Sequence, residues 1–295
     1  MTATATGRTG QLAGIGWILL AIFCFGIMDS LIKWLSAGYG TWQIIFFRAL
    51  FSLLPIAVLL ARDGGIAGLR TDRPWSHIIR ALVGTVAIFC FFHSFANLPL
   101  ADVYAISFAA PLIVTALSVP LLKEHVGWRR WTAVLVGFAG VLVMLRPGAG
   151  VVSGAALVCL LGTVFYALTM IFVRHLSKTE TNAAIVFYYM ATLTVVGAVA
   201  MLPDWRTPGA LDFALLAATG IIGGVAQLSL TQAFRLAPPS LLAPFEYTGM
   251  IWAVSFGYLF FGEVPDAAIW IGVAIVIASG LYIIHRETVL ARAGA

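Results

Sequence analysis

LAGIGWILLAIFCFGIMDSLIKWLS, residues 12–36, is the first of ten apolar stretches that together fill this chain of 295 residues. A helix rises about 1.5 Å per residue, so about 20 apolar residues cross a hydrocarbon core of about 30 Å. The predicted spans cover 12–36, 41–62, 75–97, 101–122, 128–146, 151–175, 182–202, 210–235, 240–261 and 267–285. No loop between them is long enough for a soluble domain, so the sequence predicts an all-α integral membrane protein.

The composition agrees with a chain that lies in lipid. It is 61% hydrophobic and only 10% charged, against about 25% charged in an average soluble domain. Its 29 glycines fit helices that approach closely in a membrane. Gly220 and Gly224 form a GxxxG motif, which we interpret as packing within the chain rather than as a dimer signal, and the oligomeric state stays open. Cys24, Cys90 and Cys159 lie within spans and are interpreted as small apolar residues.

Basic residues are distributed unevenly between the two sides that alternating spans define. One side is poor in basic residues and carries little beyond Arg146 and Arg206. The rich side carries Arg8, Arg62, Arg70, Arg73, Arg80, Lys123, Arg129, Arg130, Arg174, Lys178, Arg235, Arg286 and Arg292. The positive-inside rule then predicts that both termini and the 63–74 loop are cytoplasmic, in an inner membrane of bacterial type. The net charge of +5 is explained by topology, and no nucleic-acid partner is implied.

The two halves of the chain are weakly similar at a shift of about 140 residues. Each half, 1–150 and 151–295, holds five spans. Because five is odd, the second half enters the membrane from the opposite side, which predicts two inverted five-helix repeats with a substrate site between them. The matches are Lys33–Ser36 with Arg174–Ser177, Ile45–Phe47 with Val186–Tyr188, Phe95 with Phe234, Pro99 with Pro238, and Gly140–Val141 with Gly280–Leu281.

The first half carries three short motifs, and the second half carries degenerate copies of two of them. They are 111–117 (PLIVTAL), 121–124 (LLKE) and 137–141 (GFAGV), with degenerate copies at 261–263 (FGE) and 278–281 (ASGL). In these features the chain resembles the EamA branch of the drug/metabolite transporter superfamily, over about residues 12 to 285. The resemblance implies a central cavity lined by spans 1–4 and 6–9, with spans 5 and 10 peripheral. The family's glutamate matches Glu124 and Glu263, which we interpret as structural.

Three ionisable residues lie at membrane depth in the first two spans. Asp29 and Lys33 share one face of span 1, being four residues apart. Asp29 and Arg48 each lie seven residues from an outer span end, which is about 10 Å deep. We predict that Asp29 and Arg48 form an ion pair. Such a pair would serve either as a structural lock or as a polar wall that grips a charged substrate group and gates the outer mouth.

Glu246 is the second candidate, in the cytoplasmic half of span 9 and two residues after Pro244. Pro244 frees a backbone carbonyl, and span 4 also carries prolines at 111 and 120. Interrupted helices at corresponding places in two halves are typical of transporter binding sites. Glu246 is therefore predicted to bind substrate or a proton. The alternative is a structural hydrogen bond to a neighbouring helix or to Arg235.

Polar and aromatic side chains complete the set of candidate residues. His93 and Gln232 occupy equivalent positions in spans 3 and 8, and either lines the path or is simply packed. Tyr104, Tyr247 and Trp252 could stack on a planar substrate, although aromatic residues at helical spacing are more often core or interfacial. No pattern of metal ligands is present, and no cofactor is expected.

These observations predict a secondary transporter that moves a small metabolite by alternating access. An amino acid or related amphipathic compound is the favoured substrate, with export favoured, and uptake of riboflavin or an S-adenosylmethionine-like metabolite is the alternative. Proton coupling and simple facilitation both stay open. An intramembrane enzyme is the remote alternative, because no HExxH, GxSxG or Gly-rich phosphate loop is found and no catalytic residue is assigned.

Overall fold

The computed structural model describes residues 3–62, 65–71, 73–122, 128–145, 153–176, 179–237 and 239–293. All regular structure in these ranges is helical. The α-helices are α1 (Ala3–Leu35), α2 (Thr41–Arg62), α3 (Pro74–Asn97), α4 (Leu100–Ser107), α5 (Ala110–Leu122), α6 (Trp128–Leu145), α7 (Gly154–Leu176), α8 (Asn182–Ala200), α9 (Ala210–Leu236), α10 (Pro239–Glu246), α11 (Gly249–Phe261) and α12 (Ala267–Ala293). Two 3-10 helices, η1 (Gly65–Leu69) and η2 (Leu202–Asp204), lie in the connections.

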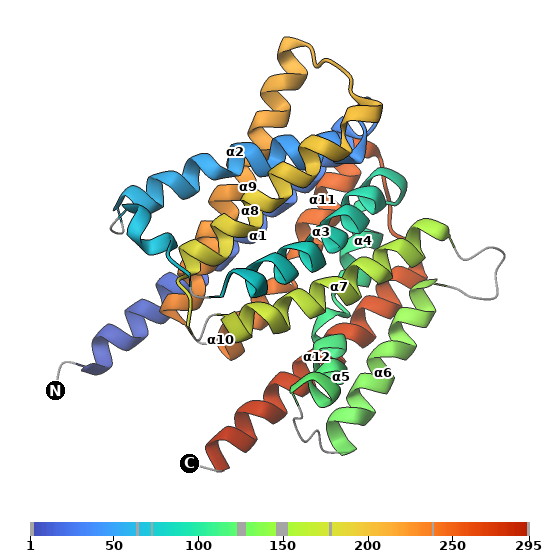
Figure 1. The fold of residues 1–295 in the computed structure, drawn as a ribbon. Helices are drawn as coiled ribbons and strands as arrows, with labels where there is room; N and C mark the ends of the chain where they lie inside the picture. The colour runs from blue at the N-terminus through green and yellow to red at the C-terminus, as the bar shows by residue number, and fades with distance from the viewer. Residues whose placement is uncertain are drawn as a thin grey trace.

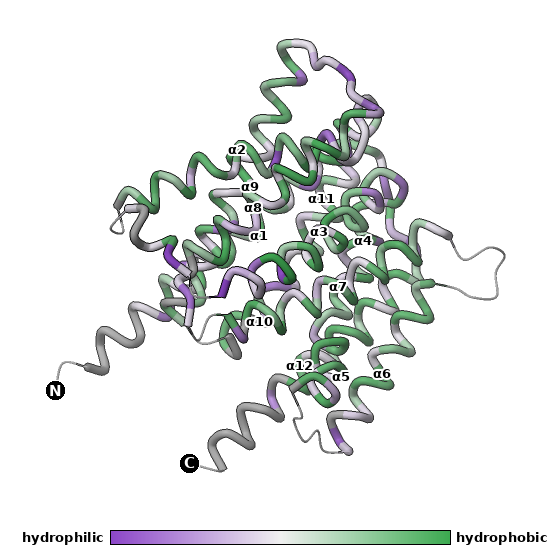
Figure 2. The backbone as a smooth tube through the Cα atoms, in the orientation of Figure 1, coloured by the Kyte–Doolittle hydropathy of each residue, from purple (hydrophilic) through white to green (hydrophobic). Residues whose placement is uncertain are grey.

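The helices follow the predicted spans closely, and the all-helical membrane architecture is confirmed. Seven helical stretches among the described residues are long and apolar enough to cross a membrane, and shorter apolar helices cover Trp131–Leu145 and Ala267–Ile283. Figure 2 shows hydrophobic residues along the helices, while the most hydrophilic residues gather near their ends. A helix that is apolar around most of its surface is stable only against lipid or other protein.

Two predicted spans, 101–122 and 240–261, are each broken into two helices. The first is interrupted at Phe108 and Ala109, and the second at Tyr247 and Thr248. Phe108 and Tyr247 are 139 residues apart, the same shift that relates Phe95 to Phe234, so the breaks occupy equivalent positions. The breaks therefore belong to the repeat itself.

Proline chemistry explains why the breaks fall near these positions. Pro111 is the second residue of α5 and has no backbone N–H to continue the ladder from α4. Pro244 removes one ladder bond within α10. The Thr248 backbone N–H then bonds the Phe245 carbonyl three residues back, at 2.9 Å, and its hydroxyl also donates to that oxygen. The tightened turn ends α10 and redirects the chain into α11.

The two halves interleave rather than packing as separate lobes. Helix α1 runs along α9, α3 along α7, and α6 along α12, while α2 contacts both α8 and α9. The broken spans meet through α4 and α11. Figure 1 shows the resulting bundle, with both chain termini near the same end. An even number of spans requires this arrangement.

Small residues allow the closest of these contacts. A Cβ atom on Gly220 of α9 would lie 2.8 Å from the backbone oxygen of Arg48 on α2, and one on Gly224 would lie 3.1 Å from that of Ser52. The GxxxG motif therefore packs against another helix of the same chain, as predicted. Cys90 and Cys159 are buried free thiols, as predicted, whereas Cys24 is only half-buried.

Candidate functional site

Asp29 of α1 is buried at membrane depth and is held by Tyr104 of α4. The Tyr104 hydroxyl donates to the Asp29 Oδ2 atom at 2.6 Å, and only 8% of Asp29 is exposed. The Tyr104 ring also packs close to the first residue of α11, Gly249, where a Cβ would lie 3.0 Å from it. The carboxyl group thus lies where α1 and the two broken spans meet.

Arg48 of α2 is also buried, but the predicted ion pair with Asp29 is wrong. No ion pair joins the two side chains, although both are among the described residues. The Arg48 Nε–H points at the Met28 sulfur, 3.4 Å away, and the guanidinium lies 5.7 Å from the centre of the Phe92 ring. The Asp29 carboxyl group is hydrogen-bonded to Tyr104 and not to Arg48. Arg48 therefore interacts with Asp29 only electrostatically, at longer range.

Lys33 lies one turn beyond Asp29 and is bound at the end of the bundle that the positive-inside rule predicts to be outer. Its Nζ is 2.6 Å from Oε1 of Glu263 and also donates to the Leu98 carbonyl. The other Glu263 oxygen accepts from the Leu100 backbone N–H at 2.9 Å. Glu263 is therefore structural, as predicted, and it ties α1 to the connection between α3 and α4. Its repeat counterpart, Glu124, lies outside the described residues.

We call the Lys33–Glu263 pair the outer latch. Further contacts between the two halves surround it. The Tyr39 hydroxyl donates to Asp212 at 2.6 Å, and this hydrogen bond raises the pKa of the Tyr39 phenol. The Gln43 side-chain amide donates to the Arg206 carbonyl at 2.6 Å. An open hollow of about 580 Å³ adjoins the latch and is lined in part by Lys33 and Asp212.

The two helix breaks touch each other at the centre of the molecule. The rings of Phe108 and Tyr247 meet edge to face with their centres 5.1 Å apart. Gly280 of α12 leaves room for the Tyr247 hydroxyl, which is buried and has no hydrogen-bond partner among the described residues. A break that faces its own repeat counterpart marks the pseudo-twofold axis.

Glu246 ends α10 beside this contact. Its side chain is accessible rather than packed, and its charge acts on the hydroxyls of Tyr166 and Tyr247. An accessible carboxylate at membrane depth is expected to face a cavity or a partner. The Arg235 side chain, the predicted structural alternative, lies outside the part of the chain whose side chains are described.

The remaining predicted residues are spread around the bundle. Trp252 meets Phe23 edge to face and stacks with Phe256, at centre distances of 4.8 and 5.6 Å, and these rings form an aromatic wall between α1 and α11. His93 lies parallel to Phe89 on α3, at 6.2 Å. Gln232 is half-buried on α9. The structure therefore gathers Asp29, Tyr104 and Arg48 in one region.

Arg80 does not lie with the loop arginines that set topology, contrary to the prediction from the distribution of basic residues. It lies six residues after the start of α3 and is only 7% exposed. Its guanidinium carbon is 3.9 Å from the centre of the Tyr189 ring of α8. Its position more than one turn inside a span could have identified it, since loop arginines lie at or beyond a span end.

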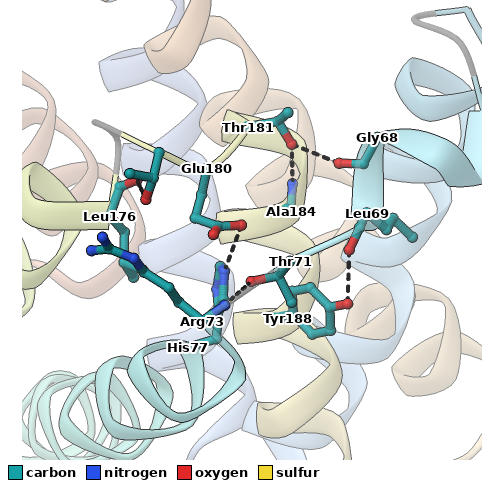
Figure 3. Close-up of polar contacts among 11 residues, drawn as sticks. Gly68, Leu69, Thr71, Arg73, His77, Leu176, Glu180, Thr181, Ala184 and Tyr188 are labelled. Carbon is teal, nitrogen blue, oxygen red and sulfur yellow. Dashed lines mark hydrogen bonds and ion pairs between the residues drawn. The ribbon is translucent and has the colours of Figure 1, made fainter.

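The opposite end of the bundle is closed by polar contacts between α3, η1 and the start of α8. His77 and Glu180 are both buried, with 3.3 Å between the His77 Nε2 and the Glu180 carboxylate. Thr181 donates to the Gly68 carbonyl at 2.7 Å, and Tyr188 to the Leu69 carbonyl at 2.8 Å. Figure 3 shows these residues close together. We call the His77–Glu180 pair, with the contacts of Thr181 and Tyr188 beside it, the inner latch.

A protein-family model matches both halves of this chain. The model of the EamA-like transporter family matches this chain twice, at residues 12–146 and 153–285. The two matches together cover most of the chain and correspond to the two halves described above.

Three characterised relatives are similar along nearly the whole chain. An S-adenosylmethionine uptake transporter of Rickettsia prowazekii is 29% identical, covering 94% of each chain. The pseudopaline exporter CntI of Pseudomonas aeruginosa is 34% identical, covering 90% of this chain and 94% of its own. A riboflavin transporter of Vibrio cholerae is 29% identical, covering 94% of each chain.

A solved crystal structure is similar in fold. It matches with a TM-score of 0.62 at 19% sequence identity, covering 92% of this chain and 94% of its own. At that identity the likeness supports the fold alone.

Proposed function

This chain belongs to the EamA-like transporter family, and from that premise we propose that it carries a small metabolite bearing an amino-acid group. It is a multi-pass membrane transporter and not an enzyme. The proposed mechanism is alternating access between two inverted repeats, in an inner membrane of bacterial type with both termini in the cytoplasm.

The observation that carries the proposal is a pair of opposite charges buried between the repeats. Asp29 is an acidic side chain with one hydrogen bond, from Tyr104, and Arg48 is a basic side chain without an acidic partner among the described side chains. A zwitterion offers an ammonium group to the first and a carboxylate to the second. Substrate would then supply the pairing that the described side chains do not give to these two groups.

The two latches support an alternating-access cycle. Lys33–Glu263 and His77–Glu180 each join one half of the chain to the other, at opposite ends of the bundle. Opening one latch while the other holds would expose the site to one side at a time. Polar contacts suit this role because water can take the place of each partner when they separate.

A second candidate substrate class rests on the aromatic wall. Phe23, Trp252 and Phe256 offer flat faces beside α1. Such faces suit a ring system such as a flavin or an adenine, and relatives carry riboflavin and S-adenosylmethionine. S-adenosylmethionine combines a ring system with an amino-acid group, so it satisfies both features. Riboflavin lacks the amino-acid group and would leave Arg48 unpaired.

Transport in reconstituted vesicles tests the proposal. Vesicles loaded with S-adenosylmethionine, a mixture of amino acids or riboflavin are assayed for exchange against each labelled compound, and inside-out vesicles report export. We expect exchange of at least one compound that bears an amino-acid group, with loss in Asp29→Asn and Arg48→Gln. Exchange of riboflavin alone, unaffected by these variants, would contradict the proposal.

A further inference from the structure

Two buried arginines lie between the latches. Arg48 is 6% exposed and Arg80 is 7% exposed. The Arg48 Nη1 atom and the Arg80 Nε and Nη1 atoms have no hydrogen-bond partner among the described residues, and neither arginine forms an ion pair with a described acidic side chain. Burying a cation without a partner is costly, so a purely structural role does not account for either residue.

Tyr189 contacts the Arg80 guanidinium directly. The guanidinium carbon lies 3.9 Å from the ring centre, within the range of a cation–π contact. The Tyr189 hydroxyl donates to the Gly84 carbonyl at 3.1 Å, which anchors the ring on α3. A Cβ on Gly84 would lie 2.7 Å from that ring, so glycine is needed for this approach.

A guanidinium that stacks by its face keeps the N–H donors on its edge free. Those donors form a planar fork that matches the two oxygens of a carboxylate. Arg80 is placed between the inner latch and the Arg48 region, since His77 lies three residues before it on α3. Tyr189 also lies within electrostatic reach of Arg48.

We propose that Arg80 and Tyr189 form an inner anion subsite that takes the carboxylate of the transported substrate as it passes between Arg48 and the inner latch. This rests on the proposed carrier function and adds a second binding position to it. Substrate binding would offset the cost of the unpaired cation, and the cost would return when substrate leaves. Arg80 is thereby assigned to substrate and not to membrane topology.

Thermal unfolding of the purified full-length chain in detergent tests the subsite. The probes are matched pairs with and without a carboxylate, namely succinate with succinamide and S-adenosylmethionine with its decarboxylated form. The variants are Arg80→Met, which keeps length and removes charge, and Arg80→Lys, which keeps charge and removes the fork. Arg70→Met is the matched control, because Arg70 is an exposed arginine in the loop before α3.

We expect at least one carboxylate to raise the unfolding midpoint of the wild type and of Arg70→Met, while its neutral counterpart does not. Arg80→Met should weaken the apparent affinity for that carboxylate at least about tenfold, the loss expected for one charge-assisted contact. Arg80→Lys should recover only part of it. Without any probe, the Arg80→Met midpoint should equal or exceed that of the wild type, because an unpaired buried charge has been removed.

Three results would overturn the subsite. They are the absence of any carboxylate effect, equal effects of a carboxylate and its neutral counterpart, and an Arg80→Met protein that responds like the wild type. The outcome is separable from the proposed function. Vesicle exchange that survives Arg80→Met rejects the subsite alone, whereas Arg80-dependent succinate binding without exchange of amino-acid compounds rejects the proposed substrate class alone.

Discussion

At the scale of single residues, the charge on Asp29 is stabilised by one hydroxyl group. Tyr104 supplies the hydrogen bond that the described structure gives to this carboxyl, while Arg48 turns toward Met28 and Phe92. A hydrogen bond to a charged group contributes about 1.5–3 kcal/mol. Tyr104 therefore positions Asp29. Because Asp29 is bonded to Tyr104, Arg48 has no acidic partner among the described side chains.

Tyr104→Phe should lower the free energy of unfolding by about 1–3 kcal/mol, because it leaves the Asp29 carboxyl without its donor. Denaturant titration in mixed micelles measures this. Tyr258→Phe, at an exposed tyrosine of α11, is the control and should change little. In double-mutant cycles, Asp29→Asn should couple more strongly to Tyr104→Phe than to Arg48→Gln. A larger coupling with Arg48 would mean that the ion pair forms in the membrane.

Glu246→Gln tests proton coupling at the second carboxyl group. The variant keeps size and hydrogen bonding, so it should fold and reach the membrane. If Glu246 carries a proton or substrate, the variant should lose the pH dependence of transport, or lose substrate binding, because it mimics the protonated form permanently. Flux in vesicles at two pH values separates these results. A native rate with a native pH response would assign Glu246 a structural role.

At the scale of helices, the contact between α2 and α9 depends on missing side chains. Gly220 lies so close to α2 that an added Cβ would be 2.8 Å from the Arg48 backbone oxygen. Any movement of this helix pair also moves Arg48, because the same turn of α2 carries the guanidinium. Close packing here therefore couples the bundle to the candidate site.

Gly220→Ala should destabilise the protein by about 1–3 kcal/mol, the usual cost of overpacking a tight contact. Gly16→Ala is the matched control, because Gly16 also lies within a helix but has no atom within 4 Å of an added Cβ. Ala is favoured over Gly in a helix by about 1 kcal/mol, so the control should be neutral or stabilising. Unfolding in mixed micelles compares the two. Equal effects would remove the special role of this contact.

Hydrophobic runs made the helices predictable, but not the way in which the broken spans end. Ala110 and the residues after it are as apolar as those of α4, so composition gives no boundary there. The prolines indicated interruptions, yet Pro244 acts one turn before the actual break at Tyr247. The contact between Asp29 and Tyr104 could not be predicted either. The number of residues from a span end gives the depth of a residue in the membrane, but not the direction in which its side chain points.

At the scale of the whole molecule, the two latches and the meeting breaks divide the bundle into an outer end, a centre and an inner end. Lys33–Glu263 lies at one end, His77–Glu180 at the other, and Phe108 meets Tyr247 between them. Both chain termini lie near the same end as η1 in Figure 1. The positive-inside rule assigns that end to the cytoplasm.

Cysteine labelling in intact cells tests this orientation. Gly68→Cys, in η1, and Gly209→Cys, before α9, are both suitable because an added Cβ meets no atom within 4 Å. In a cysteine-free background, an impermeant thiol reagent added outside should label residue 209 and leave residue 68 unlabelled until the cells are broken. The reverse pattern would invert the topology, and labelling of both from outside would contradict the inverted-repeat arrangement.

Arg48 and Tyr189 occupy equivalent positions in the two repeats but differ in chemistry. The shift that aligns Ile45–Phe47 with Val186–Tyr188 also aligns these two residues. A carrier with identical repeats would present the same site to both sides, because the twofold rotation that relates the repeats would exchange its two conformations. Here the two faces should reach half-saturation at different substrate concentrations. For movement driven only by the substrate gradient, the ratio of maximal rate to half-saturation must still be equal in both directions. The face that binds more tightly must therefore also be the slower face.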